Sequence, residues 1–147
     1  MGVAVIDKTS GKEILVHSGC LVTSRSLSFG ERLVALGQSF EELIAAHQPE
    51  LVALEKLFFT TNQKTASAVS EVRGMLLYLT SKHGLKLAEY TPQEVKGAVA
   101  GYGKASKEQV TAMVSKLITL PPGKRLDDEY DAIAIGLTAL ARASFAD

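Results

Sequence analysis

The spacing of apolar residues predicts that strands come first in the chain and then alternate with helices. Residues 3–6 (VAVI) and 13–24 (EILVHSGCLVTS) are rich in β-branched residues, and DKTSGK between them is typical of a turn. We therefore expect a β-hairpin. Residues 51–54 (LVAL) form a continuous apolar run, as in a strand buried on both faces, and residues 85–90 (LKLAEY) predict a further short strand.

Three segments repeat their apolar residues every third or fourth position, which predicts amphipathic helices. The first covers residues 30–47 and ends before Pro49, and the second covers residues 66–82 and ends at His83-Gly84. The third covers residues 127–142, where acidic side chains at the start favour the helix dipole.

Two capping signals predict two further helices. Thr91 is followed by Pro92 and Glu94, and Ser106 is followed by Gln109, which are the spacings of a capping box. With no internal repeat or linker between these elements, we expect residues 1–147 to form one α/β domain.

Composition narrows the class of protein. With 147 residues, 46% hydrophobic and 22% charged, the chain has the balance of one soluble domain. It has no apolar run long enough to span a bilayer and no secretory leader, so we expect no membrane contact and a cytoplasmic location. Cys20 is the only cysteine and the three histidines are far apart, so neither an internal disulfide nor a structural zinc site is expected.

The net charge of zero conceals an uneven distribution. Residues 1–55 carry 4 basic and 7 acidic side chains, residues 56–125 carry 11 and 4, and residues 126–147 carry 1 and 5. A basic middle segment beside an acidic one favours a polyanion-binding face next to a carboxylate cluster. The alternative is that these lysines lie on solvated helix faces.

Three carboxylates are candidates for chemistry. Glu55 follows LVAL, at the end of a predicted buried strand, where open α/β sheets place their sites. Asp128 and Asp131 are three residues apart and therefore share one face of the last helix. Each could instead be structural, Glu55 as a surface residue paired with a lysine and the aspartates as helix-start residues. Together they predict oxygen ligation of Mg²⁺ or Mn²⁺ and metal-assisted phosphoryl transfer.

Four stretches of the sequence, in order and at the right spacing, carry a resemblance to a known family. They are GVAVID with HSGCLVTS, LVALEKLFFTTNQKTA with the later VRG, YTPQEVKGAVAGYGKASKEQV, and LDDEYDAIAIGL. With them the chain resembles the RuvC-type Holliday junction resolvases, which have a ribonuclease H-like fold, over nearly its whole length. The resemblance implies a mixed sheet flanked by helices.

The resemblance also implies an activity and partners. It implies a homodimeric, Mg²⁺-dependent endodeoxyribonuclease, with Mn²⁺ as a possible substitute, that nicks two symmetric strands of a four-way DNA junction in recombination and repair. It further implies that the protein acts together with a branch-migration complex of the RuvA and RuvB type. Glu55 matches the family's catalytic glutamate at a strand end, and Asp128 and Asp131 match its pair of acids on the last helix.

The resemblance assigns four further residues to DNA. Phe58 matches an aromatic residue placed against unpaired bases, although it could instead pack in the core beside Phe59. Lys96, Lys104 and Lys107 fall in the family's basic stretch and would contact backbone phosphates. The helix from about residue 65 to 79 corresponds to the dimer-forming helix, although its apolar residues could equally be intramolecular core.

One family feature is missing from the sequence. The family has an earlier strand that ends in a GIDPG-like sequence, whose aspartate is a metal ligand, and no such sequence occurs here. GVAVID corresponds to the family's second strand, so Asp7 begins the hairpin turn and we do not assign it to catalysis. We therefore expect the central first strand to be absent.

This absence leaves three hypotheses open. The leading one is a junction-resolving nuclease whose chain lacks a segment needed for full activity. The second is a junction-binding protein that has lost cleavage, and the third is another ribonuclease H-like nuclease acting on RNA or RNA–DNA hybrids.

Overall fold

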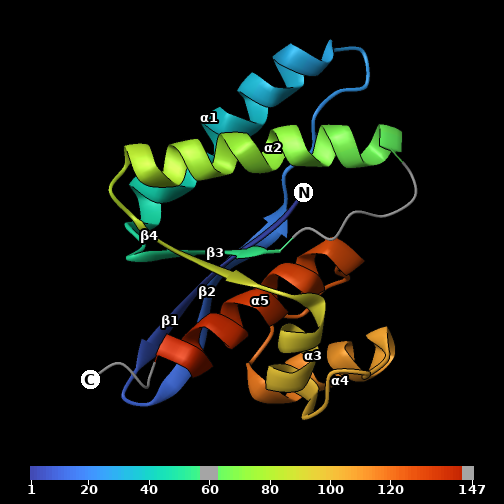
Figure 1. Cartoon of the computed structure of the whole chain (residues 1–147). Coiled ribbons are helices and arrows are strands. Elements are labelled where there is room, and N and C mark those ends of the chain that lie inside the picture. The colour runs from blue at the N-terminus through green and yellow to red at the C-terminus, as the bar shows by residue number, and fades with distance from the viewer. Residues whose placement is uncertain (57–62, 144–147) are drawn as a thin grey trace. The chain divides into compact units, whose positions relative to one another are not determined.

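The computed structural model describes residues 1–56 and 63–143, and its elements follow the predicted order of strands and helices. The elements are β1 (Gly2–Thr9), β2 (Lys12–Cys20), α1 (Phe29–His47), β3 (Leu51–Glu55), α2 (Gln63–Lys82), β4 (Lys86–Tyr90), α3 (Pro92–Ala100), α4 (Lys107–Leu117) and α5 (Asp127–Ala143). The α/β prediction is confirmed (Figure 1). None of the described helices is long and apolar enough to cross a bilayer.

The strands form two separate sheets of two strands each. β1 pairs with β2 in antiparallel fashion, β3 pairs with β4, and within the described residues no strand joins the two pairs. The predicted turn DKTSGK was too long, because only Ser10 and Gly11 lie between the strands, with φ of 52° and 77°. A loop of two residues with positive φ suits the twist of a hairpin. Asp7 is therefore paired with Ile14 inside β1.

Capping side chains fix where three helices begin. The predicted capping boxes of Thr91 with Glu94 and of Ser106 with Gln109 are both formed. A third box, which the sequence analysis did not identify, starts α1: the Ser28 backbone N–H donates to Glu31 Oε2 at 2.8 Å, and the Glu31 backbone N–H donates to Ser28 Oγ at 3.3 Å. Each box satisfies backbone donors that a helix start leaves unpaired.

The chain divides into two compact units. Unit 1 comprises residues 1–20, 53–55 and 89 onwards, and unit 2 comprises residues 21–52 and 56–88. The β3–β4 sheet contributes residues to both. That residues 1–147 behave as a single domain stays a prediction.

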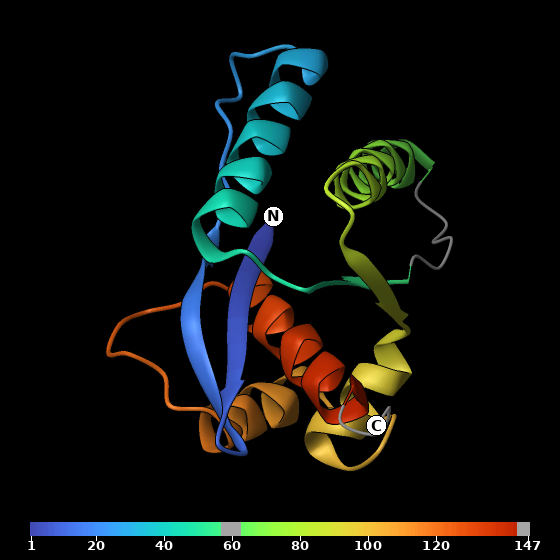
Figure 2. The ribbon, with the colours of Figure 1, turned by 90° about the vertical axis from the view of Figure 1, so that its left-hand side faces the viewer.

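Unit 1 is built around α5, which packs on the β1–β2 hairpin and also contacts α3 and α4 (Figures 1 and 2). Ile133 of α5 and Val114 of α4 are fully buried. Gly136 lets β1 approach α5, because a Cβ atom at this position would lie 2.9 Å from Ile6 Cδ1. The apolar face predicted for the last helix is thus the centre of this core.

Unit 2 contains the paired helices α1 and α2. Gly37 of α1 is buried, and a Cβ atom there would lie 3.1 Å from Met75 Sδ and 3.6 Å from Leu79 Cδ1 of α2. Leu79 is only 6% exposed, so this part of the α2 apolar stripe is intramolecular core, one of the two alternatives left open.

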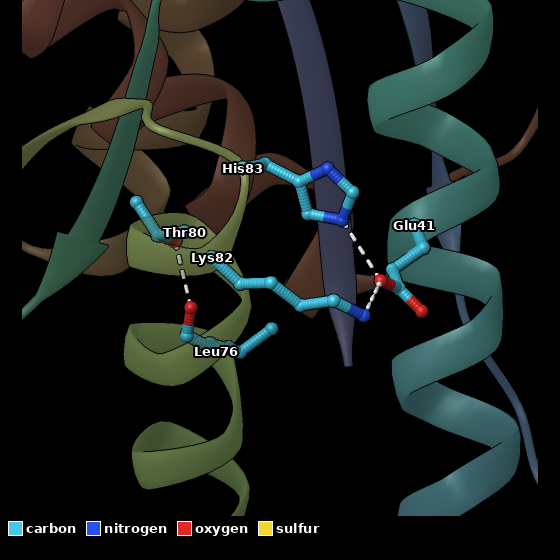
Figure 3. Close-up of polar contacts among 5 residues, drawn as sticks. All are labelled: Glu41, Leu76, Thr80, Lys82 and His83. Atoms are coloured by element: carbon cyan, nitrogen blue, oxygen red, sulfur yellow. Dashed lines mark hydrogen bonds and ion pairs between the residues drawn. The ribbon is translucent and has the colours of Figure 1, made fainter.

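A polar cluster also joins the two helices of unit 2. Glu41 Oε1 of α1 lies 3.0 Å from Lys82 Nζ and 2.8 Å from His83 Nε2, at the end of α2 (Figure 3). The hydrogen bond from His83, followed by that from Lys82, lowers the pKa of Glu41 below its ordinary value. On the inner side of α2, the buried Thr80 hydroxyl donates to the Leu76 carbonyl oxygen at 2.7 Å.

Candidate active site

Two of the predicted acids, Glu55 and Asp131, lie in unit 1, and the negative charge of Asp131 acts on Glu55. Glu55 is the last residue of β3, and Asp131 is the fifth residue of α5. The pKa of Glu55 is raised, first by partial desolvation at the strand end and second by the negative charge of Asp131. Both residues retain exposure to solvent. Two mutually repelling carboxylates at the surface form an arrangement that a cation would relieve.

Asp128 lies one turn before Asp131 on α5 and is exposed. Within residues 1–56 and 63–143, no group of three or more His, Cys, Asp or Glu side chains is gathered closely enough to hold a metal ion. The structure therefore relates Glu55 to Asp131 electrostatically, and the role of Asp128 as a third ligand stays a prediction.

The Glu55–Asp131 pair is compatible with Mg²⁺. Mg²⁺ prefers oxygen ligands, keeps several of its waters, and is commonly held by one or two carboxylates together with substrate phosphates. A full protein cage of three or four side chains is not needed for such a site. Because both carboxylates are accessible, phosphate and water can complete the coordination.

Lys107 lies beside the acids at the start of α5. Its Nζ is 3.2 Å from Asp127 Oδ2 and 3.6 Å from Asp131 Oδ2. The hydrogen bond to Asp127 is the main cause of the raised pKa of Lys107. About half of the Lys107 side chain is exposed, so these are surface ion pairs of low energy, and the ammonium can exchange them for another anion. Sequence reasoning did not select Asp127, although it stands next to Asp128.

The other three residues predicted to bind DNA are Lys96, Lys104 and Phe58. Lys96 lies in α3 and is half-buried, whereas Lys104 is exposed in the loop that precedes α4. In the described part of the chain neither lysine forms an ion pair with an acidic side chain. Phe58 lies outside the described residues, so its predicted contact with bases stays a prediction.

A nearly buried polar group fastens the start of α5 to the hairpin. The Ser18 hydroxyl of β2 donates to Glu129 Oε1 at 2.6 Å, and Arg125 Nε lies 3.2 Å from the same oxygen as an ion pair. The Arg125 and Glu129 side chains are only 10% and 13% exposed. Sequence reasoning missed this group, because Glu129 reads as one more acid at a helix start and nothing marks Ser18 as its partner.

The first residue of β1 also contacts this part of α5. A Cβ atom on Gly2 would lie 1.8 Å from the Asp128 carbonyl oxygen, whereas Ile6 meets Gly136 further along α5. Four strand residues span about 13 Å and eight helix residues about 12 Å, so β1 runs alongside α5 in the same direction. Asp7 follows Ile6 and so lies about 16 Å along β1 from Gly2, which contacts the Asp128 backbone. The exclusion of Asp7 from the site stays a prediction.

Comparisons with known proteins identify the family. A sequence profile of the family described as crossover junction endodeoxyribonuclease RuvC matches residues 1–139. The chain is 42% identical over 146 residues to the crossover junction endodeoxyribonuclease RuvC of Moorella thermoacetica, covering 99% of this chain and 86% of the relative. It is 41% identical over 137 residues to the protein of that name from a Roseiflexus species, covering 93% and 82%.

Solved structures agree with the sequence comparison. A Thermus thermophilus RuvC structure superposes with a TM-score of 0.81 at 30% identity, covering 98% of this chain and 97% of that one. T. thermophilus RuvC in complex with Holliday junction substrate superposes with a TM-score of 0.87 at 28% identity, covering 99% and 89%. The resemblance inferred from the four sequence stretches is therefore confirmed, and this chain belongs to the crossover junction endodeoxyribonuclease RuvC family.

Proposed function

We propose that the chain is an endodeoxyribonuclease that binds four-way DNA junctions and nicks them in a metal-dependent reaction, in DNA recombination and repair. The observation that carries the proposal is the Glu55–Asp131 pair: Glu55 ends β3, Asp131 lies near the start of α5, and the negative charge of Asp131 acts on Glu55. Relatives that cover nearly the whole chain are named for this activity, and one solved relative is described in complex with a Holliday junction substrate.

In the proposed site, Glu55 and Asp131 hold Mg²⁺, or Mn²⁺ in its place, and Asp128 supplies a further oxygen from the same helix face. When bound, the ion activates the attacking water as a Lewis acid and stabilises charge on the scissile phosphate. The carboxylates orient the site from two different elements. Desolvation and then the negative charge of Asp131 raise the pKa of Glu55, and a bound cation would offset the repulsion between the two carboxylates.

The DNA contacts are assigned to the basic residues of unit 1. Lys96 and Lys104 would contact backbone phosphates beside the acids. Lys107 would move from its surface ion pairs with Asp127 and Asp131 to a phosphate near the scissile bond, an exchange that its exposure permits. Phe58 would stack on an unpaired base at the crossover.

We further propose that the chain acts as a homodimer in the cytoplasm, beside a branch-migration complex of the RuvA and RuvB type. Tyr78 on α2 is 66% exposed, and exposed aromatic residues are enriched at protein interfaces. Light scattering of the purified chain should give twice the mass of one chain. A wild-type mass of one chain would exclude the dimer. A dimer whose mass Tyr78→Ala leaves unchanged would exclude a contact that depends on Tyr78 of α2.

The decisive experiment compares substrates and variants in one assay. Four-way junction, linear duplex of the same sequence and an RNA–DNA hybrid are incubated with the chain and Mg²⁺. We expect tight binding and slow nicking of the junction alone, with nicking abolished in Glu55→Gln and Asp131→Asn. Glu42→Gln, an exposed acid of α1, is the matched control and should nick normally. Nicking that persists in Asp131→Asn would contradict the assigned chemistry, and preference for the hybrid would indicate a different nuclease.

A second candidate function is junction binding without cleavage. The observation that favours it is the separation of β1–β2 from β3–β4, together with the absence of a preformed three-carboxylate group among the described residues. In that case the junction is bound with the same affinity in wild type and Glu55→Gln, and no nicking is detected with Mg²⁺ or Mn²⁺.

A further inference from the structure

We propose that Glu129 is a positioning residue: together with Ser18 and Arg125 it fixes the start of α5, and thereby the aspartates of the proposed metal site, to the β1–β2 hairpin. We call these three residues the α5 anchor. This inference rests on the proposed function and adds to it a residue that itself touches neither metal nor DNA.

The geometry of the anchor brings three elements to one oxygen. Glu129 Oε1 accepts a hydrogen bond from Ser18 Oγ of β2 at 2.6 Å and lies 3.2 Å from Arg125 Nε. Arg125 in turn donates from Nη2 to the Pro121 carbonyl oxygen at 2.8 Å, which ties down the loop that leads into α5. The strand, the loop and the first turn of the helix therefore meet at Glu129.

Burial makes this group different from the other ion pairs of unit 1. The Glu129 and Arg125 side chains are 13% and 10% exposed, whereas Lys107 and Asp127 are 51% and 78% exposed. A nearly buried carboxylate loses its hydration and depends on its protein partners, so losing one partner is costly. Removing the Ser18 hydroxyl leaves Arg125 as the only described partner of Oε1 and should loosen the first turn.

A second contact confines the same turn independently. Gly2 of β1 leaves no room for a Cβ atom, which would lie 1.8 Å from the Asp128 carbonyl oxygen and 2.3 Å from its carbonyl carbon. β1 thus presses directly on the backbone of Asp128, while β2 holds the next residue through Ser18. Asp131 follows Glu129 by two residues, about 3 Å along the helix axis. A shift of the turn would therefore move Asp128 and Asp131 relative to Glu55.

The test uses two variants of Ser18 that have the same shape. Ser18→Thr keeps the hydroxyl and Ser18→Val replaces it with a methyl group, and both are β-branched residues that suit a strand. Amide hydrogen exchange at residues 129–131 is measured on the full chain without metal, because the Glu129 and Tyr130 amides donate to the Leu126 carbonyl oxygen, and Mn²⁺ affinity is measured by titration. Junction binding without metal serves as a control for the fold and the DNA surface.

We expect Ser18→Val to raise the exchange rates of residues 129–131 about tenfold over Ser18→Thr, and to weaken Mn²⁺ binding about tenfold. Junction binding should change less than twofold in both. Equal exchange in the two variants would overturn the anchor. Faster exchange in Ser18→Val with unchanged Mn²⁺ affinity would mean that the α5 anchor is only a structural contact, and would overturn the positioning role of Glu129.

Failure of the proposed function gives a distinct result. If the wild-type chain takes up no Mn²⁺, or takes it up equally well in Asp131→Asn, the metal site is wrong and the positioning role falls with it. The exchange contrast between Ser18→Val and Ser18→Thr still reports on the contact to Glu129, so the two failures are distinguishable.

Discussion

Gly136 of α5 faces Ile6 of β1 so closely that a Cβ atom at position 136 would lie 2.9 Å from Ile6 Cδ1 and 3.4 Å from Cγ1. Alanine favours a helix over glycine by roughly 1 kcal/mol, but overpacking costs about 1–3 kcal/mol. We expect Gly136→Ala to lower the free energy of unfolding, measured by urea denaturation. Gly74→Ala on α2 is the control, because a Cβ atom there meets nothing within 4 Å, and it should stabilise.

The same contact predicts a rescue. Ile6→Val removes Cδ1, so adding Gly136→Ala in that background should recover the helix preference and stabilise the chain. If the effect of Gly136→Ala is the same with and without Ile6→Val, the two residues do not compete for this space.

The Glu41 cluster predicts a stability difference that depends on pH. Hydrogen bonds from His83 and Lys82 lower the pKa of Glu41 in the folded chain below its value of 4.5 in the unfolded chain. The ionised carboxylate therefore stabilises the fold fully at pH values above 4.5, and this stabilisation is lost as the pH falls through the lower pKa of the folded chain. Glu41→Gln should therefore be less stable than wild type at pH 6, with the difference vanishing towards pH 2. Chemical denaturation at several pH values measures it.

The neighbouring residue supplies the control for Glu41. Glu42 is exposed on the same helix, and Glu42→Gln should show no comparable loss at pH 6. A loss of equal size in both variants would assign the effect to net charge and contradict the role of the cluster.

The interaction of Glu55 with Asp131 predicts a change in titration. Desolvation is the larger cause of the raised pKa of Glu55, and the charge of Asp131 is the smaller one. Without metal, Asp131→Asn should lower the pKa of Glu55 while leaving it above 4.5, because desolvation remains. NMR titration of the side-chain carboxyl carbon measures this. An unchanged pKa would mean that the two carboxylates do not sense each other.

Phosphate contacts predict a specific change in salt dependence. Each contact to duplex DNA contributes about 0.9 to the slope of log affinity against log salt, so Lys104→Ala should reduce the slope for junction binding by roughly that amount. Lys12→Ala, which changes an exposed lysine at the hairpin turn, should leave it unchanged. Equal slopes in Lys104→Ala and wild type would remove Lys104 from the DNA surface.

The sequence allowed much of the fold to be predicted, because local signals determine helix starts and apolar periodicity determines faces. The capping boxes at Thr91 and Ser106 were read from three-residue spacings, and Ser28 with Glu31 carries the same readable signal. The predicted hairpin turn was longer than the observed turn, which consists of Ser10 and Gly11, because polar strand residues such as Asp7 resemble turn residues.

The candidate site was only partly predictable from sequence. Glu55 and Asp131 could be selected because each follows a recognisable local pattern, a buried strand end and a helix start. The partnership of Ser18 with Glu129 joins residues 111 positions apart and has no local signature. Such contacts depend on how β2 packs against α5, which pattern reasoning does not resolve.

If Glu55 and Asp131 share one divalent ion, Mn²⁺ titration followed by NMR should detect it at both residues. Paramagnetic Mn²⁺ broadens signals of nuclei close to it. We predict that the amide signals of Glu55 and Asp131 broaden first and at the same Mn²⁺ concentration, and that Asp131→Asn weakens the broadening at Glu55. Broadening at one residue without the other, or first at an unrelated acid, would show that the two carboxylates do not share an ion.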